Sequence, residues 1–321
     1  MRLTSRVARA LLLAAGVGVL GLVVVRIGPR AIFDLLHRVG WGFVSVSLLY
    51  AAHLVVRSFA LWRSLPPPAV PFADVLRVRL AGEAVEMLTF TGPFLAEPAK
   101  GWLLKRSGID ASKAFGAVAI EYLLYTVVSS WLAAFALAAL VTRETFPPAL
   151  RGPVAAIVVC TVAFTAGCVV AAVARRGLIV PSIRAASRVI GLERSSTAAA
   201  KVAPVEEVLV SFMHDRPGRL GEVVAVEVCG HALLAAEIWI VLGSIGFEVH
   251  AMTVLLLEGA IKFIGVAFFF IPGQLGASEG VYALVATVLG YPAAAGLTVA
   301  LVRRVRALIV AGVGLIVAAR S

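Results

Sequence analysis

Charged side chains inside apolar segments are the residues of this sequence that could do chemistry. The 321-residue chain is 61% hydrophobic and only 15% charged, yet several acids and bases fall within its longest apolar runs. An ionisable side chain inside a membrane span is costly, so it pairs with an opposite charge or lines a path for an ion or a polar substrate. The residues concerned are Glu121, Glu227, His231, Glu237, Glu258, Lys262, Glu279 and Arg304.

Two pairs of these residues have the spacing of one helical turn. Glu258 and Lys262 are four apart, which fits either an ion pair within one helix or a part of a substrate path. Glu227 and His231 have the same spacing, and Glu227 lies near the end of its apolar run, where a long side chain can reach the membrane interface. A metal site there lacks a third ligand. We therefore predict no metal and no cofactor.

Residues 270–280 interrupt apolar sequence and cannot form a continuous helix. Pro272 removes a backbone donor and clashes with the preceding turn. Gly273 and Gly276 favour turn conformations. Glu279 then lies where a new helix begins, facing its positive end. Inside a bilayer, broken backbone is tolerated only where protein or a water-filled cavity covers it. The pattern predicts two half-helices with a carboxylate near their junction, which is where membrane transporters build substrate sites.

A second break, Thr91–Pro98, leads to Glu97 and to a basic helix that carries Lys100. Glu121 follows Glu97 by 24 residues, as Arg304 follows the acid of the other break by 25. A carboxylate in the first turn of a helix is stabilised by the helix dipole whatever the protein does. The breaks lie in apolar sequence, where loop backbone is itself costly, and this favours a functional role for both acids.

The charged residues in the spans that follow the two breaks can be interpreted in two ways. Glu121 and Arg304 can form a buried ion pair with each other, or can line a cavity for a zwitterionic or anionic head group. Lys100 and Arg304 are suited to phosphate, because basic side chains form strong charge-assisted hydrogen bonds with it. We expect Arg303 and Arg306, on other faces of the same helix, to be interfacial.

The fold class follows from the mean hydropathy of +0.99 and the length of the apolar runs. About 20 apolar residues cross a bilayer as a helix. We predict an all-α polytopic membrane protein with about six full spans and two re-entrant helical hairpins, 72–107 and 251–290. If both hairpins cross fully, the number of spans becomes eight or more. The six predicted spans are 10–25, 41–62, 114–141, 153–174, 222–246 and 293–319.

The order of these elements predicts an internal repeat within one domain, 1–321. Residues 1–150 and 151–321 each read as span, span, hairpin, span. An odd number of crossings in each half inverts one copy relative to the other, as in many transporters. One hairpin then opens from the cytoplasm and the other from outside.

The net charge of +11 is concentrated in regions between spans, above all in 175–221. Basic loops face the cytoplasm, so we predict 175–221 to be a cytoplasmic loop, with both termini inside, in the cytoplasmic (inner) membrane. We expect no nucleic-acid binding, because no compact basic domain with interleaved aromatics is present. The motifs GxSxG, HExxH and the P-loop are also absent from the sequence, and we predict no catalytic residues.

These residues resemble a known family, the transmembrane, flippase-like region of lysylphosphatidylglycerol synthases and its stand-alone relatives. The second-half pattern of that family is matched by Pro272-Gly273-Gln274-Leu275-Gly276-Ala277-Ser278-Glu279, by Gly290-Tyr291-Pro292 and by Arg304. The first-half pattern is matched by Ala96-Glu97-Pro98-Ala99-Lys100 with Gly108.

The sequence departs from the family pattern at three positions. Tyr122 replaces the Arg of a Glu-Arg pair, so that pair is matched only at Glu121. Ala96 stands where Gly is commoner, and Lys100 stands where Arg is commoner. These departures bear on the substrate rather than on the fold.

The resemblance implies an inner-membrane protein that moves or binds an amphipathic lipid, namely a phospholipid, a polyprenyl-linked glycolipid or a hopanoid. In the full synthases a soluble aminoacyl-transferase domain follows the membrane region. None follows Ser321 here, and so we do not expect synthesis of aminoacylated lipid. The expected partners are membrane lipids, with a second copy of the chain or a lipid-biosynthesis protein in addition.

Our prediction is a lipid translocase. The alternatives are a membrane transferase that acts on a lipid-linked substrate and a non-transporting membrane subunit that binds a partner through 175–221. The predicted substrate-binding residues are Glu97, Lys100, Glu121, Pro272, Gly273, Gly276, Glu279 and Arg304.

Overall fold

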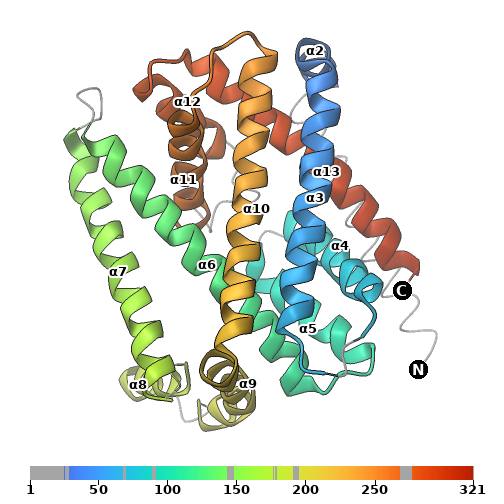
Figure 1. Ribbon diagram of the computed structural model, residues 1–321, viewed down its shortest axis with the longest axis vertical. Helices are drawn as coiled ribbons and strands as arrows, with labels where there is room; N and C mark the ends of the chain where they lie inside the picture. Colours follow the sequence, from blue (N-terminus) through green and yellow to red (C-terminus); the bar gives the residue numbers. More distant parts are fainter. Residues whose placement is uncertain are drawn as a thin grey trace.

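The computed structural model describes residues 25, 29–67, 70–88, 92–142, 148–175, 177, 179–190, 195–267 and 277–320, and these form α-helices and one short 3-10 helix, with no strand among them (Figure 1). The predicted all-α fold is therefore confirmed. The predicted span 10–25 lies outside the described residues except for Val25. Pro272, Gly273 and Gly276 also lie outside them. The elements are α2 (Pro29–Val39), α3 (Trp41–Ser64), α4 (Phe72–Leu88), α5 (Pro93–Arg106), α6 (Ala111–Val141), η1 (Pro148–Leu150), α7 (Arg151–Val173), α8 (Ile179–Ile190), α9 (Ser195–Asp215), α10 (Pro217–Ser244), α11 (Ala251–Ala267), α12 (Ala277–Val288) and α13 (Ala293–Arg320).

Four stretches of helix among the described residues are long and apolar enough to cross a membrane: α3, α6, η1 with α7, and α10. They coincide with the predicted spans 41–62, 114–141, 153–174 and 222–246 to within a few residues at most ends. Helix α13 has the length of a span but carries Arg303, Arg304 and Arg306 near its middle. The number of full crossings, and whether the hairpins are re-entrant, stay predictions.

Helices α3 and α10 form the central pair of the bundle and run in opposite directions (Figure 1). An ion pair of 2.6 Å between Arg63 Nη2 and Glu222 Oε2 joins the end of α3 to the start of α10. Farther along, Val46 of α3 packs in the same apolar cluster as Ile238 and Val241 of α10. Apolar side chains of both helices thus hold the two halves of the chain together.

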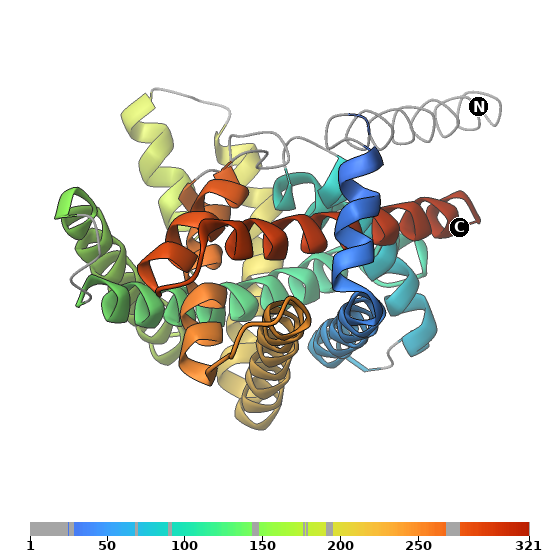
Figure 2. The same ribbon diagram turned by 90° about the horizontal axis from the view of Figure 1, so that it is seen from above.

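Each predicted hairpin region contains two helices, α4 and α5 in the first half and α11 and α12 in the second. Helix α4 packs against α13, and α11 packs against α6, so each pair contacts the last helix of the other half. Figure 1 shows α4 and α5 toward the lower right and α11 and α12 toward the upper left. In Figure 2, α6 and α13 both run across the bundle, whereas α3 and α10 are seen nearly end-on. This packing of each helix pair against the other half of the chain fits an inverted repeat, which stays a prediction.

The same turn occurs twice, 182 residues apart. Gly108 after α5 has φ +93, and Gly290 after α12 has φ +86, a backbone conformation that favours glycine. The N–H of Ile109 donates to the carbonyl of Leu104 (3.4 Å), and that of Tyr291 donates to the carbonyl of Ala286 (2.9 Å), again 182 residues apart. Each turn starts the long helix that follows, α6 or α13, and so sets where its charged residues lie.

The described residues of 175–221 are mostly helical, and neither α8 nor α9 is among the apolar helices long enough to cross a membrane. That this segment is a cytoplasmic loop stays a prediction. It contains α8, α9 and the first turn of α10, and Figure 1 shows α8 and α9 across the lower ends of the long helices. The Glu206 carboxylate of α9 accepts from the backbone N–H groups of Ile179 and Val180 and so caps α8. The four orphan N–H groups of a helix start need such partners, and this cap ties α8 to α9.

Candidate functional site

Glu121 is the centre of the first buried cluster. Its side chain on α6 is fully buried, and its Oε1 accepts from Arg57 Nη2 of α3 (2.5 Å) and from Arg79 Nη2 of α4 (2.6 Å). Arg79 Nη2 also donates to the backbone carbonyl of Arg57 (3.1 Å). These three residues, the first triad, join α3, α4 and α6, which also share an apolar cluster.

Arg303 of α13 is the centre of a second buried cluster. Its Nη2 lies 2.8 Å from Glu258 Oε2 of α11, and its Nε lies 3.2 Å from Glu237 Oε2 of α10. Arg303, Glu237 and Glu258 form the second triad. Lys262 Nζ adds a contact of 2.9 Å to Glu258, and Arg306 pairs with Glu237.

The two triads occupy corresponding helices with opposite charges. Helices α3, α4 and α6 carry two arginines around one glutamate, whereas α10, α11 and α13 carry two glutamates around one arginine. The central residues, Glu121 and Arg303, are 182 residues apart, the same offset as the repeated turn. Burying one ion without a partner costs several kcal/mol. The charges in each half therefore fix which helices must stay together.

Two tyrosines lie against cationic side chains of the two buried clusters. The guanidinium carbon of Arg57 lies 3.8 Å from the centre of the Tyr125 ring, and Lys262 Nζ lies 3.4 Å from the Tyr125 hydroxyl. On the other side, Arg306 lies 3.5 Å from the centre of the Tyr50 ring, and the Tyr50 hydroxyl donates to a carboxylate of α4 at 2.9 Å. That carboxylate belongs to Glu83, one helical turn from Arg79 on α4. Tyr125 therefore links Arg57 of the first triad to Lys262 of the second cluster, and Tyr50 links Arg306 of the second cluster to α4.

Each half also holds an ion pair whose acid comes from the predicted hairpin region, and we call these two contacts the hairpin ion pairs. Lys100 Nζ lies 2.6 Å from Glu97 Oε1, both on α5. Arg304 Nη2 of α13 lies 2.7 Å from Glu279 Oε1 of α12 and donates to Ser278 Oγ (2.9 Å). The basic side chains are 2% and 7% exposed, whereas the acids are 13% and 17% exposed. In each of the two ion pairs the carboxylate is therefore more exposed than its basic partner.

The stem of Lys100 lies against Gly82 of α4. A Cβ at position 82 would lie 2.6 Å from Lys100 Cγ and 2.8 Å from its Cδ, too close for real atoms. Only a glycine at this position lets the apolar stem cross between the two hairpin helices and bring the ammonium to Glu97. The position of Lys100 is thus set by α4 as well as by its own helix.

A family model described as the Lysylphosphatidylglycerol synthase TM region matches residues 7–314. The chain belongs to this family. Together with the four helices of the described residues that are long and apolar enough to cross a membrane, this makes it a multi-pass membrane protein. Comparison with curated proteins found no match, and comparison with solved structures found none either.

The charged motif residues that the resemblance named take part in two ion pairs and in the first triad. Glu279 and Arg304 pair with each other, and Glu97 pairs with Lys100, while Glu121 belongs to the first triad. Glu279 lies in the first turn of α12, as predicted. The predicted position of Glu97 in a first turn is wrong. Helix α5 begins at Pro93 and the acid lies in its second turn, because proline is preorganised for the first helical position.

Several other expectations need correction. Glu121 and Arg304 do not pair with each other, since each has a nearer partner of opposite charge. Arg303 and Arg306 are not interfacial but lie in the buried second cluster. Glu227 does not reach the interface, because it is 1% exposed and faces α3. The ion pair of Glu258 and Lys262 on one helix is confirmed.

Sequence reasoning missed Arg57 and His53. Both lie inside the predicted span 41–62, so the rule that marks ionisable residues in apolar runs applies to them as well. Arg79, within the predicted hairpin 72–107, was also not recognised as a buried charge. Its exposed fraction of 0% depends on α3 and α6, which are distant in the sequence.

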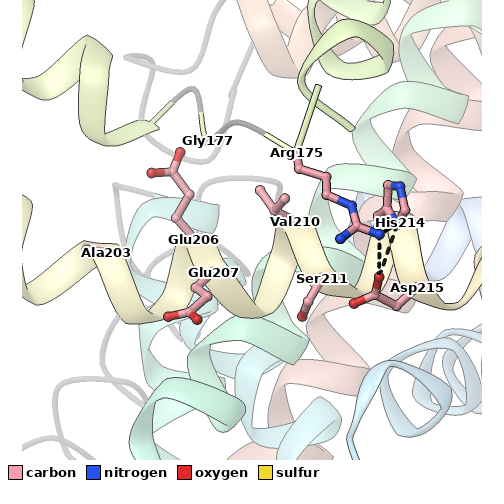
Figure 3. A pocket seen from close by; sticks show the side chains of 9 residues that line it. All are labelled: Arg175, Gly177, Ala203, Glu206, Glu207, Val210, Ser211, His214 and Asp215. Atoms are coloured by element: carbon pink, nitrogen blue, oxygen red, sulfur yellow. Dashed lines mark hydrogen bonds and ion pairs between the residues drawn. The ribbon is translucent and has the colours of Figure 1, made fainter. Parts of the chain in front are cut away.

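A cavity of about 350 Å³ lies beside α9, far along the chain from the predicted site residues (Figure 3). In Figure 3 the Arg175 side chain points toward His214 and Asp215. The distances from Asp215 Oδ1 are 3.6 Å to Arg175 Nη2 and 3.0 Å to His214 Nδ1. No predicted site residue lines this cavity, and among the described residues no group of three or more His, Cys, Asp or Glu is placed to hold a metal.

Proposed function

We propose that this chain is a lipid translocase that moves the polar head group of an amphipathic lipid past the hairpin ion pairs while the acyl tails stay in the bilayer. The observation that carries the proposal is the pair of partly open contacts, Glu97 with Lys100 and Glu279 with Arg304. Each places a basic group and an acid together in membrane-embedded sequence, once in each half of the chain.

The energetics favour a head group that exchanges partners with these pairs. Removing one member of a buried ion pair costs about 3–5 kcal/mol, because the other charge is left without compensation. A head group with a phosphate and a cationic or hydroxyl group avoids this cost. Its phosphate replaces Glu97 beside Lys100, and its donor group binds the released carboxylate. The same exchange at Glu279 and Arg304 passes the head group to the second half.

Among the lipid classes expected for the family, those with a phosphate fit Lys100 and Arg304, since charge-assisted hydrogen bonds to phosphate are strong. The cytoplasmic membrane is the proposed location, with 175–221 on the cytoplasmic side. The two hairpins lie toward opposite ends of the bundle (Figure 1). One then receives the head group and the other releases it.

The test is head-group movement in proteoliposomes, followed with an acyl-labelled fluorescent phospholipid and an impermeant quencher. We expect Lys100→Ala and Arg304→Ala to slow the movement about tenfold to a hundredfold, because each loses charged hydrogen bonds worth about 1.5–3 kcal/mol. The matched control is Lys105→Ala, which changes an exposed lysine of the same helix, α5. Monodisperse elution in detergent checks that each variant is folded.

The outcomes separate the alternatives. Unchanged lipid movement in both Lys100→Ala and Arg304→Ala contradicts a translocation path through the hairpin pairs. Mass spectrometry of the lipids after the assay tests the transferase alternative, since a transferase leaves a covalently altered lipid. Deletion of 195–215 tests the partner-binding alternative, which needs that segment, whereas translocation needs the hairpins.

A further inference from the structure

Glu227 is a buried carboxylate that the structure leaves poorly compensated. It lies on α10, is 1% exposed, and neither of its carboxylate oxygens accepts a hydrogen bond from the described residues. Among the described residues, the cationic atom nearest to its carboxylate is Arg57 Nε, 3.6 Å from Glu227 Oε2. A buried ion needs close hydrogen bonds to repay its desolvation. Glu227 as an anion does not have them.

Glu227 lacks a close hydrogen bond from Arg57 because the Arg57 guanidinium is already bound to Glu121. Its Nη2 donates to Glu121 Oε1 at 2.5 Å, so two carboxylates from different helices share one guanidinium. The second oxygen of Glu121 also accepts no hydrogen bond from the described residues. Two like charges this close disfavour each other's ionisation. A proton on Glu227 removes that repulsion and gives the site a donor for an unused oxygen.

A histidine lies one helical turn along the same face of α10. His231 Nε2 is 3.0 Å from Ser129 Oγ, its Nδ1 has no hydrogen-bond partner among the described residues, and its ring stacks on Tyr125 with centroids 5.0 Å apart. Imidazole accepts and returns protons through its two nitrogens. The titratable and charged groups that surround Glu227 and His231 are His53 and Arg57 of α3, Arg79 of α4, Glu121 and Tyr125 of α6, and Glu258 and Lys262 of α11.

We propose that Glu227 is the proton-binding carboxyl of this protein and that its protonation couples lipid movement to a proton gradient. The inference rests on the proposed translocase function. A proton from solution binds one carboxylate oxygen of Glu227 and is released later to the other side, and His231 exchanges protons with it. An O–H bond forms and breaks at Glu227 and an N–H bond forms and breaks at His231, so no other bond changes.

The location of Glu227 gives the proton a mechanical consequence. Helices α3 and α10 are the central contact between the two halves, and Arg57 is bound from both α6 and α10 across that contact. When Glu227 is ionised, Arg57 holds α3 to α10 electrostatically. When Glu227 is neutral, that attraction is lost, and the cluster of Arg57, Arg79, Glu121 and Glu227 carries one net positive charge. A lipid phosphate is then attracted to the same region, so proton and phosphate bind together.

The experiment uses the full chain in proteoliposomes under an imposed pH difference, with the labelled phospholipid of the flipping assay and a pH dye inside. One coupled proton per lipid allows up to about a tenfold lipid asymmetry for each pH unit. We expect Glu227→Gln to abolish the response to the gradient while downhill lipid exchange continues. Glu227→Asp keeps a carboxyl and is expected to retain the response. The control is Glu222→Gln, five residues earlier on α10 in a partly exposed pair.

A second measurement separates this inference from the proposed function. Infrared difference spectra of the purified protein between acidic and basic pH report protonated carboxyl groups without any lipid movement. A carboxyl band that is lost in Glu227→Gln supports the proton site even if no lipid moves in any sample, which would refute only the translocase. A gradient response or a carboxyl band that persists unchanged in Glu227→Gln overturns the inference.

Discussion

Replacement of Glu121 by glutamine tests whether the first triad holds the bundle together. The glutamine keeps the size of the side chain but removes the charge that compensates Arg57 and Arg79, which are 2.5 and 2.6 Å away and almost fully buried. Breaking a buried ion pair in this way costs about 3–5 kcal/mol. Because two arginines lose their partner at once, we expect Glu121→Gln to lie at the upper end of that range.

The control removes a carboxylate charge from an ion pair that is more exposed to solvent. Glu222 pairs with Arg63 at 2.6 Å, but the side chains are 35% and 28% exposed. Water screens such a pair, so we expect Glu222→Gln to cost only about 0–1 kcal/mol. Glu121→Asp keeps the charge but is one methylene shorter, and we expect it to fall between the two.

The assay is unfolding in mixed detergent micelles, followed by circular dichroism, which gives the difference in the free energy of unfolding between variants. A loss below about 1 kcal/mol for Glu121→Gln, equal to that of the control, would refute the argument that buried charge fixes the contacts of α3, α4 and α6. Arg57 and Arg79 would then be compensated by groups other than Glu121.

Two further predictions concern positions outside the triads. Gly82→Ala is expected to displace the stem of Lys100, because the new Cβ would lie 2.6 Å from Lys100 Cγ. We expect this displacement to slow lipid movement in the proteoliposome assay. The control is Gly221→Ala, whose new Cβ meets open space and should leave lipid movement unchanged. Asp110→Ala is expected to lower stability at neutral pH, because Asp110 Oδ1 caps α6. This oxygen accepts from the Ser112 hydroxyl and from the backbone N–H groups of Ser112 and Lys113. These hydrogen bonds hold the pKa of the Asp110 carboxyl below its ordinary value. A lowered pKa contributes stability above the ordinary carboxyl pKa and loses it as the pH falls through the lowered value. The difference from the unmodified chain in thermal-unfolding midpoints should therefore disappear on acidification, and a difference that persists in acid would contradict the cap.

The sequence predicted the helices of this protein with few errors because membrane spans have a local cause. A run of about 20 apolar residues must be helical in a bilayer, since no water is there to satisfy its backbone. The span 114–141, for instance, needs no knowledge of its neighbours. Helices α8 and α9 were not predicted, because neither has the apolar run of a span and α8 is capped by Glu206 from a later helix.

Ion-pair partners could not be read from the sequence in the same way. Glu121 has to find cations on α3 and α4, which lie 64 and 42 residues away. Any of the buried bases satisfies the charge requirement on composition alone. The sequence therefore led us to consider Arg304 as its partner, whereas the packing of α12 on α13 gives that arginine to Glu279.

What the sequence determined by itself is the membrane location, the helical fold, the two interrupted segments and which residue types are buried at a cost. What only the tertiary structure decided is how those charges are shared. Arg57 lies 2.5 Å from Glu121 but 3.6 Å from Glu227, because α3 packs against both α6 and α10 and the packing sets the two distances. Hydrophobic burial depends mainly on local composition, whereas electrostatic compensation depends on distances between helices, and those exist only in the folded chain.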